Sequence, residues 1–186
     1  MPRRPRRDYC IPVDDDGQPA REVGAWVEEK YRRVGRYCEM FSTGMKARWE
    51  ARVYIDLYAG AGYSRIRGTQ RLLLGSPLIS LSVPDRFDRY IFCESDQDAL
   101  SALKARVGRI SPEADVRFVP GDVNENVQLI LEEIPQHRPD YRVLSFCFVD
   151  PFSGALVAAS PVPSAASVSP PSRRTPAGVL GPLRPA

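Results

Sequence analysis

The first half of the chain carries an apolar stripe with helical spacing. Between residues 22 and 42, hydrophobic side chains recur every three or four positions, which predicts one amphipathic helix ending near residues 42–44. The stripe consists of Val23, Trp26, Val27, Tyr31, Val34, Tyr37, Cys38 and Phe41. A stripe of this width is typical of a helix that packs on a sheet.

Farther along, short apolar runs have the length and the β-branched or aromatic content of buried strands. These runs are residues 53–58, 89–93, 116–119 and 143–149, and the helical stretches between them are residues 77–83, 96–107 and 124–134. Strands that alternate with helices favour βαβ units and a parallel sheet covered on both faces. The predicted fold class is therefore α/β, with a Rossmann-like parallel sheet of about four strands and flanking helices.

The two ends of the chain have a different character. Residues 1–20 are rich in Arg, Pro and Asp and lack periodicity, so we expect a mobile leader whose deletion leaves folding intact. Residues 153–186 contain seven prolines but no aromatic and no acidic residue, which predicts a disordered tail. The domain itself is expected to span residues 21–152.

Composition narrows the class of protein. No apolar run approaches the roughly 20 residues of a membrane span, and the arginine-rich start is not followed by the apolar region of a secretory signal, so we expect a cytoplasmic protein. The net charge of +3 equals the three arginines of residues 153–186, which leaves residues 1–152 neutral. This charge gives no support for a nucleic-acid partner. The N-terminal arginines could contact phosphates, but nearby aspartates favour a solvated tail.

The cysteines do not form a metal-binding pattern. Cys10, Cys38, Cys93 and Cys147 contain no CxxC pair, and His137 is the sole histidine. We expect four reduced thiols and no metal site.

The strongest chemical signal is the strand at residues 53–58, which runs directly into a glycine-rich turn. Gly60 and Gly62 would let the backbone approach a ligand that a Cβ would exclude. A dinucleotide fingerprint needs a third glycine three positions later, where this chain has Arg65, and that counts against NAD. A nucleoside without a pyrophosphate, such as S-adenosylmethionine, fits better.

Acidic residues follow the strands of the predicted sheet. Asp56 is unusual inside a buried strand; it would bind the ammonium of the ligand directly or through water, or else serve as a capping or salt-bridging Asp. Glu94 ends the second strand and would accept hydrogen bonds from two ribose hydroxyls. The separation of 38 positions between Asp56 and Glu94 indicates an insertion, which we place at residues 63–74. Ser76 is then a plausible N-cap, with Pro77 at the first helical position.

The third and fourth strands also end in carboxylates. Asp122 could accept from an adenine amino group, or it could cap a helix that begins near Asn124. Asp150, Pro151 and Phe152 follow the fourth strand, where the carboxylate could bind an acceptor amine or guide its proton while the ring walls the pocket. The alternative for this last motif is a strand-terminating turn.

In this order the motifs resemble the class I methyltransferases. More narrowly, residues 22–152 resemble the three-Cys-motif partner family through Lys30 and Tyr37, Tyr54–Gly62, Gly75–Leu78, Gly121–Asn124 and Phe148–Phe152. The resemblance implies an S-adenosylmethionine-dependent methyltransferase encoded beside a radical-type protein that bears a three-cysteine motif. It assigns the cofactor to Asp56, Ala59, Gly60, Gly62, Glu94 and Asp122, and the acceptor side to Asp150, Pro151 and Phe152.

Three functions are consistent with these motifs. An enzyme that transfers a methyl group is the first, a non-catalytic module that binds the three-cysteine-motif protein is the second, and an NAD-type oxidoreductase is the least favoured. A methyltransferase sheet of the resembled type has seven strands, whereas only four precede the abrupt change of composition after residue 152. We therefore hypothesise a truncated or frameshifted gene product, with a genuine disordered tail as the alternative.

Overall fold

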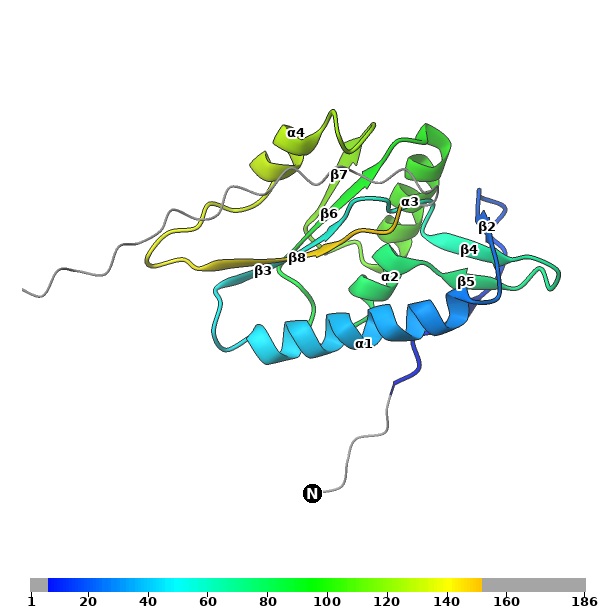
Figure 1. Cartoon of the computed structure of the whole chain (residues 1–186), viewed down its shortest axis with the longest axis horizontal. Helices are drawn as coiled ribbons and strands as arrows, with labels where there is room; N and C mark the ends of the chain where they lie inside the picture. Colours follow the sequence, from blue (N-terminus) through cyan, green and yellow to red (C-terminus); the bar gives the residue numbers. More distant parts are fainter. Residues whose placement is uncertain (1–6, 152–186) are drawn as a thin grey trace, which may run out of the picture. The chain divides into compact units, whose positions relative to one another are not determined.

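The structure is a computed structural model that describes residues 7–151 (Figure 1). Phe152 and the predicted tail lie outside these residues. The helices are α1 (Val27–Met45), α2 (Ser76–Leu81), α3 (Gln97–Ile110) and α4 (Val127–Glu132). The strands are β1 (Pro12–Val13), β2 (Arg21–Val23), β3 (Ala51–Asp56), β4 (Tyr63–Ile66), β5 (Leu72–Leu74), β6 (Arg89–Glu94), β7 (Val116–Pro120) and β8 (Val143–Phe148).

The main sheet has four strands in the order β7-β6-β3-β8, and every neighbouring pair is parallel. The α/β class and the four-strand parallel sheet predicted from the sequence are therefore confirmed. From β3 the chain builds outward through β6 and β7, and then returns to the other side of β3 to form β8. Tyr54 in β3 consequently pairs with Tyr90 on one side and Phe146 on the other.

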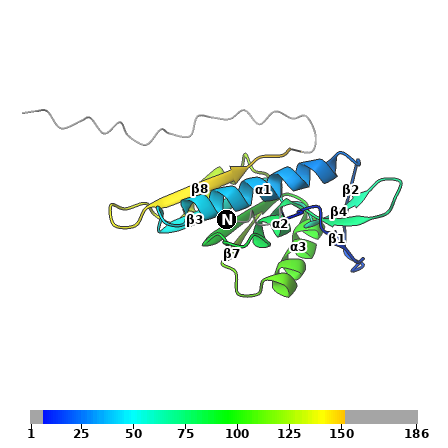
Figure 2. The ribbon, with the colours of Figure 1, turned by 90° about the horizontal axis from the view of Figure 1, so that it is seen from below.

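The two faces of this sheet follow the alternation of side chains along each strand. On one face Tyr54 stacks on Phe146 with ring centroids 5.8 Å apart, within a core that α1, α2 and α3 cover (Figure 2). On the other face Val53 and Ile55 pack toward Ile130 of α4. This second face is covered less completely, because α4 has only six residues and most of the β8 side chains on this face are exposed.

A second, mixed sheet has the order β1-β5-β4-β2. Its β4–β5 hairpin is antiparallel and lies within the predicted insertion at residues 63–74. β1 adds to the hairpin in antiparallel orientation, whereas β2 pairs with β4 in parallel. The N-terminal segment and the insertion thus form one sheet together.

Residues 7–20, which the sequence assigns to a mobile leader, make contacts with the rest of the domain in the structure. The Tyr9 side chain is completely buried against α1, at a place where a Cβ on Gly35 would lie 2.0 Å from the Tyr9 ring. The Tyr9 hydroxyl donates to Glu39 at 2.7 Å. Individual contacts of this kind, rather than a periodic apolar pattern, order the segment, which is why the pattern did not reveal them.

Several element boundaries also differ from the predictions. α1 begins at Val27 rather than at residue 22, because Arg21–Val23 hydrogen-bond to β4 as a strand. α4 covers a shorter range than residues 124–134. Gly75 is the N-cap of α2, so Ser76 and Pro77 each lie one position farther into the helix than expected. Within residues 7–151, no helix has the length and apolar character needed to cross a membrane.

Candidate functional site

The candidate site lies at the carboxyl ends of the parallel strands, on both sides of β3. Ligands of open α/β sheets bind at the topological switch point, where the order in which strands are added to the sheet reverses. In this sheet the switch point lies between β3 and β8. The register places Asp56 beside Phe148 and Glu94 beside Pro120. The carboxylates predicted from four separate strands therefore follow the same edge of one sheet.

The two glycines of the turn after β3 have different surroundings. Both have positive φ, +62° at Gly60 and +84° at Gly62, a region that favours glycine. A Cβ on Gly60 would meet no atom within 4 Å, whereas one on Gly62 would lie 2.8 Å from the Leu103 side chain and 3.0 Å from Leu78. Gly60 thus leaves room for a ligand, while Gly62 permits close packing of the turn on α2 and α3.

Asp56 is fully buried just below this turn. Its carboxylate accepts from the Tyr58 backbone N–H at 3.3 Å and from the Tyr54 hydroxyl at 3.4 Å. Burial raises the pKa of Asp56 to about 6, although hydrogen bonds from Ser76 and Tyr58 act in the opposite direction, and the charge of Asp150 raises it further. Among residues 7–151, the Asp56 carboxylate has no salt-bridge partner and caps no helix, and its predicted contact with the ammonium of a ligand stays a prediction.

Glu94 connects the second strand to the glycine turn. Its Oε2 accepts from the Gly60 backbone N–H at 2.7 Å, and its Oε1 accepts from Asp96 N–H at 2.9 Å. Around it lies a cavity of about 180 Å³, which we call the Glu94 cleft. The cleft is lined by Pro19, Ala20, Arg21, Gly60, Ala61, Glu94, Asp96 and Ala99.

Asp122 lies apart from this cleft. It is exposed, and its Oδ1 accepts from the backbone and side-chain nitrogens of Asn124 at 2.7 and 3.0 Å. The Asp122 side chain does not cap α4, whose N-cap is Asn126, but the Asp122 carbonyl accepts from the Asn126 backbone N–H at 3.1 Å and from Asn126 Nδ2 at 2.9 Å. Its predicted contact with adenine stays a prediction.

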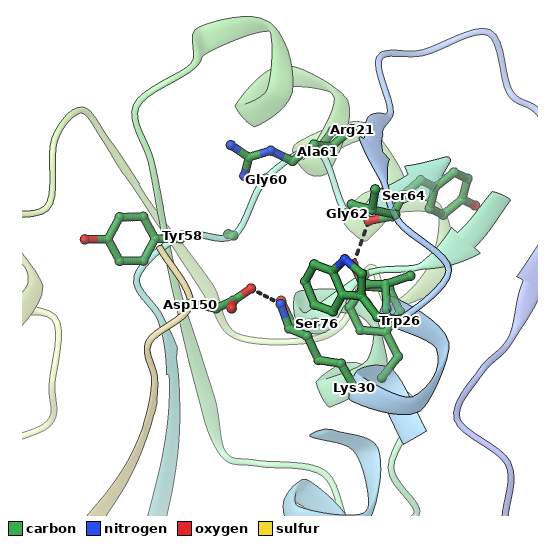
Figure 3. Close-up of a pocket in the computed structure, with 16 residues that line it drawn as sticks. Arg21, Trp26, Lys30, Tyr58, Gly60, Ala61, Gly62, Ser64, Ser76 and Asp150 are labelled. Carbon is green, nitrogen blue, oxygen red and sulfur yellow. Dashed lines mark hydrogen bonds and ion pairs between the residues drawn. The ribbon is translucent and has the colours of Figure 1, made fainter. Parts of the chain in front are cut away.

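Asp150 forms an ion pair with Lys30 of α1 (Figure 3). The Lys30 ammonium also lies 5.2 Å from the Trp26 ring centroid and 5.9 Å from that of Phe148. Trp26, Lys30 and Asp150 line a pocket on the α1 side of the glycine turn, which we call the Lys30 pocket. Its lining includes Arg21, Trp26, Lys30, Tyr31, Tyr58, Ala59, Gly60, Ala61, Ser64, Ser76 and Asp150.

Besides Arg21, Lys30 and Asp150, the polar side chains of this pocket are neutral hydroxyl groups. The Tyr31 hydroxyl and Ser64 Oγ lie 2.6 Å apart and are buried. Burial raises the pKa of Tyr31 to about 12, so the phenol keeps its proton at neutral pH. Pro151 lines an adjoining cavity with Trp26, Arg67 and Asp150.

The sequence did not identify Arg21, Trp26 or Arg106 as parts of the site. One feature of the sequence could have pointed to this region, namely a charged residue within an apolar stripe. Lys30 lies four residues after Trp26 and four before Val34, so it interrupts the apolar stripe of α1. Arg106 interrupts the stripe of α3 in the same way and is 1% exposed. A charge on a buried stripe needs a partner, and here it marks the site.

The described residues of this region contain no set of metal ligands. Within residues 7–151, no group of three His, Cys, Asp or Glu side chains could hold a metal ion. All four cysteines are free thiols; Cys10, Cys38 and Cys93 are buried and Cys147 is exposed.

Comparisons with protein-family models, curated proteins and solved structures give no match to this chain.

Proposed function

We propose that this protein is an S-adenosylmethionine-dependent methyltransferase with a Rossmann-like, methyltransferase-type sheet, as its resemblance to the three-Cys-motif partner family implies. The main support for the proposal lies beside the switch point of the parallel sheet. There Gly60, which has open space where a Cβ would be, lies close to the carboxylates of Asp56 and Glu94. A nucleoside that also bears an amino acid needs this combination of an open backbone and several separate polar groups.

The arrangement of the two cavities fits a ligand with two parts. The Glu94 cleft and the Lys30 pocket share Arg21, Gly60 and Ala61, so one elongated molecule would reach both across the glycine turn. Glu94 would accept hydrogen bonds from ribose hydroxyls while its other contacts hold the turn in place.

The acceptor side is expected near Asp150. When bound, S-adenosylmethionine supplies an electrophilic methyl group attached to sulfur. Asp150 would accept a hydrogen bond from an acceptor amine, and the ion pair with Lys30 would fix the direction of its carboxylate. Catalysis would then depend chiefly on proximity and orientation.

An NAD-type oxidoreductase is supported less well. Arg65, which replaces the third glycine of the dinucleotide fingerprint, lies on β4 and pairs with Asp15. No helix follows the glycine turn directly; the β4–β5 hairpin intervenes, and Gly75 N–H then donates to the Gly62 carbonyl at 2.7 Å. The helix packing under a pyrophosphate is therefore absent from this part of the chain.

Isothermal calorimetry on the 186-residue chain tests the cofactor assignment. We expect S-adenosylmethionine and S-adenosylhomocysteine to bind, and Glu94→Gln to weaken both by about 10- to 100-fold, the range for one charge-assisted contact. Glu113→Gln is the matched control, because Glu113 is exposed and pairs with Arg86. Absence of binding heat in a sample that melts cooperatively would refute the proposal. Transfer of radiolabelled methyl to protein or nucleic-acid fractions tests the enzymatic step.

A further inference from the structure

The N-terminal segment forms one wall of the candidate site, and its position is set by a buried arginine. Arg106 Nε and Nη2 donate to the two carboxylate oxygens of Asp16 at 2.9 and 2.6 Å. Its Nη1 donates to the carbonyls of Pro19 at 2.8 Å and Ala61 at 2.7 Å. One guanidinium therefore joins residues 16–19 to the glycine turn.

Arg106 is itself held rigidly. Its guanidinium lies 3.9 Å from the Tyr63 ring centroid, and the side chain is almost inaccessible to solvent. Since the segment continues directly into β2, whose Arg21 pairs with Ser64 of β4, the backbone of Arg21 is fixed from both sides. Its side chain starts from a defined point beside Gly60 and Ala61.

Arg21 lines both the Glu94 cleft and the Lys30 pocket, and its side chain extends over the glycine turn (Figure 3). Burial raises the pKa of Tyr31 in the Lys30 pocket, and the charge of Arg21 offsets a small part of that rise. Asp150 lies in the same pocket, where it pairs with Lys30, whereas Asp56 is buried beneath the glycine turn and does not line the pocket. The lining of this pocket thus holds two cations, Arg21 and Lys30, and one carboxylate, Asp150.

The excess of positive charge in this lining complements the carboxylate of an α-amino acid. We propose that Arg21 binds the carboxylate of the amino-acid end of S-adenosylmethionine, and that Arg106 and Asp16 position Arg21 for this contact. The inference rests on the proposed function and assigns a residue outside the motifs that carry it. Arg21, rather than Lys30, receives the carboxylate because it lines both cavities and so adjoins the nucleoside as well.

Two probes separate this contact from binding of the nucleoside. S-adenosylhomocysteine contains the amino-acid end, whereas 5′-methylthioadenosine keeps the adenosine and lacks it. In calorimetry on the full chain, we expect Arg21→Met to weaken S-adenosylhomocysteine binding about 10- to 100-fold and to change 5′-methylthioadenosine binding by less than about twofold. Arg21→Lys keeps the charge and should recover part of the loss. Arg33→Met, at an exposed arginine paired with Glu29, is the matched control and should change neither.

The outcomes separate the two proposals. Equal weakening of both probes by Arg21→Met would make Arg21 a merely structural residue and overturn the inference, as would unchanged binding of both. If wild-type protein binds 5′-methylthioadenosine and S-adenosylhomocysteine equally well, the carboxylate has no partner, and the inference fails while the cofactor assignment stands. If folded wild-type protein binds neither probe, the proposed function fails and the inference with it.

Discussion

Replacing Asp16 by asparagine would test whether the N-terminal segment is part of the folded domain. The Asp16 side chain is 11% exposed and receives hydrogen bonds from Arg106 and, at 3.1 Å, from Arg109. Asn keeps the shape of the side chain but removes its charge, which leaves the buried guanidinium of Arg106 without its counter-ion. We expect the variant to fold but with a lower melting temperature.

The size of the effect follows from the pKa of Asp16. The hydrogen bond from Arg106 lowers this pKa from 3.8 to about 2, which corresponds to about 2 kcal/mol of folding free energy at neutral pH. For a domain of this size the loss lowers Tm by about 4–8 °C. Because the folded-state pKa is the lower one, the stabilisation is complete above the unfolded pKa near 4 and disappears as pH falls toward 2. Wild type and Asp16→Asn should therefore converge in acid.

Thermal melts followed by circular dichroism at pH 7 and pH 3 provide the assay. The difference in stability between the two proteins should shrink to about half between these pH values. Asp15→Asn is the matched control; Asp15 pairs with Arg65 at the surface, and we expect almost no change in Tm. Equal melting temperatures of wild type and Asp16→Asn at pH 7 would refute the argument and support the mobile leader predicted from the sequence.

Two further substitutions test the geometry of the glycine turn. Gly60→Ala should lower the free energy of unfolding by about 1–2 kcal/mol because of its positive φ alone. Gly62→Ala should lower it by roughly 1–3 kcal/mol more, because the added Cβ contacts Leu103. Urea denaturation measures both losses, and equal losses would contradict the difference in packing. Asp56 has a folded-state pKa of about 6, above its unfolded value, so its burial reduces stability as pH rises from about 4 to 6. Between pH 4 and pH 7, the stability of Asp56→Asn relative to wild type should therefore rise by up to about 3 kcal/mol, as measured in thermal melts. A stability difference that does not change with pH would show that the buried carboxylate carries no such penalty.

Much of the main sheet could be predicted from the chain because its signals are local. β3 is buried along its whole length, and an apolar run followed by glycines indicates such a strand without reference to any other segment. The same logic located Glu94 at the edge shared with the glycine turn. Such predictions depend only on the period of the pattern and on the polarity of parallel strands.

The second sheet could not be predicted in the same way. β2 has three residues, two of them exposed, and its single buried residue, Val23, also fits the helical spacing of α1. The strand exists because β4 offers it a partner more than 40 residues away, which no local pattern records. The contact between Asp16 and Arg106, 90 residues apart, is equally invisible in the sequence. The N-terminal wall of the site therefore required the structure.

The return of the chain to β8 has a consequence for biosynthesis. β3 pairs with β6 through a connection of moderate length, but its pairing with β8 joins segments as distant as Glu50 and Arg142, which are 92 residues apart. Contacts between residues so far apart in the sequence form late, because closing a long loop costs conformational entropy before the contacts stabilise it. On the ribosome, β3, β6 and β7 emerge first, and one edge of β3 keeps unpaired N–H and C=O groups until β8 has been synthesised. During that interval the nascent chain presents a strand edge of the kind that chaperones protect from aggregation.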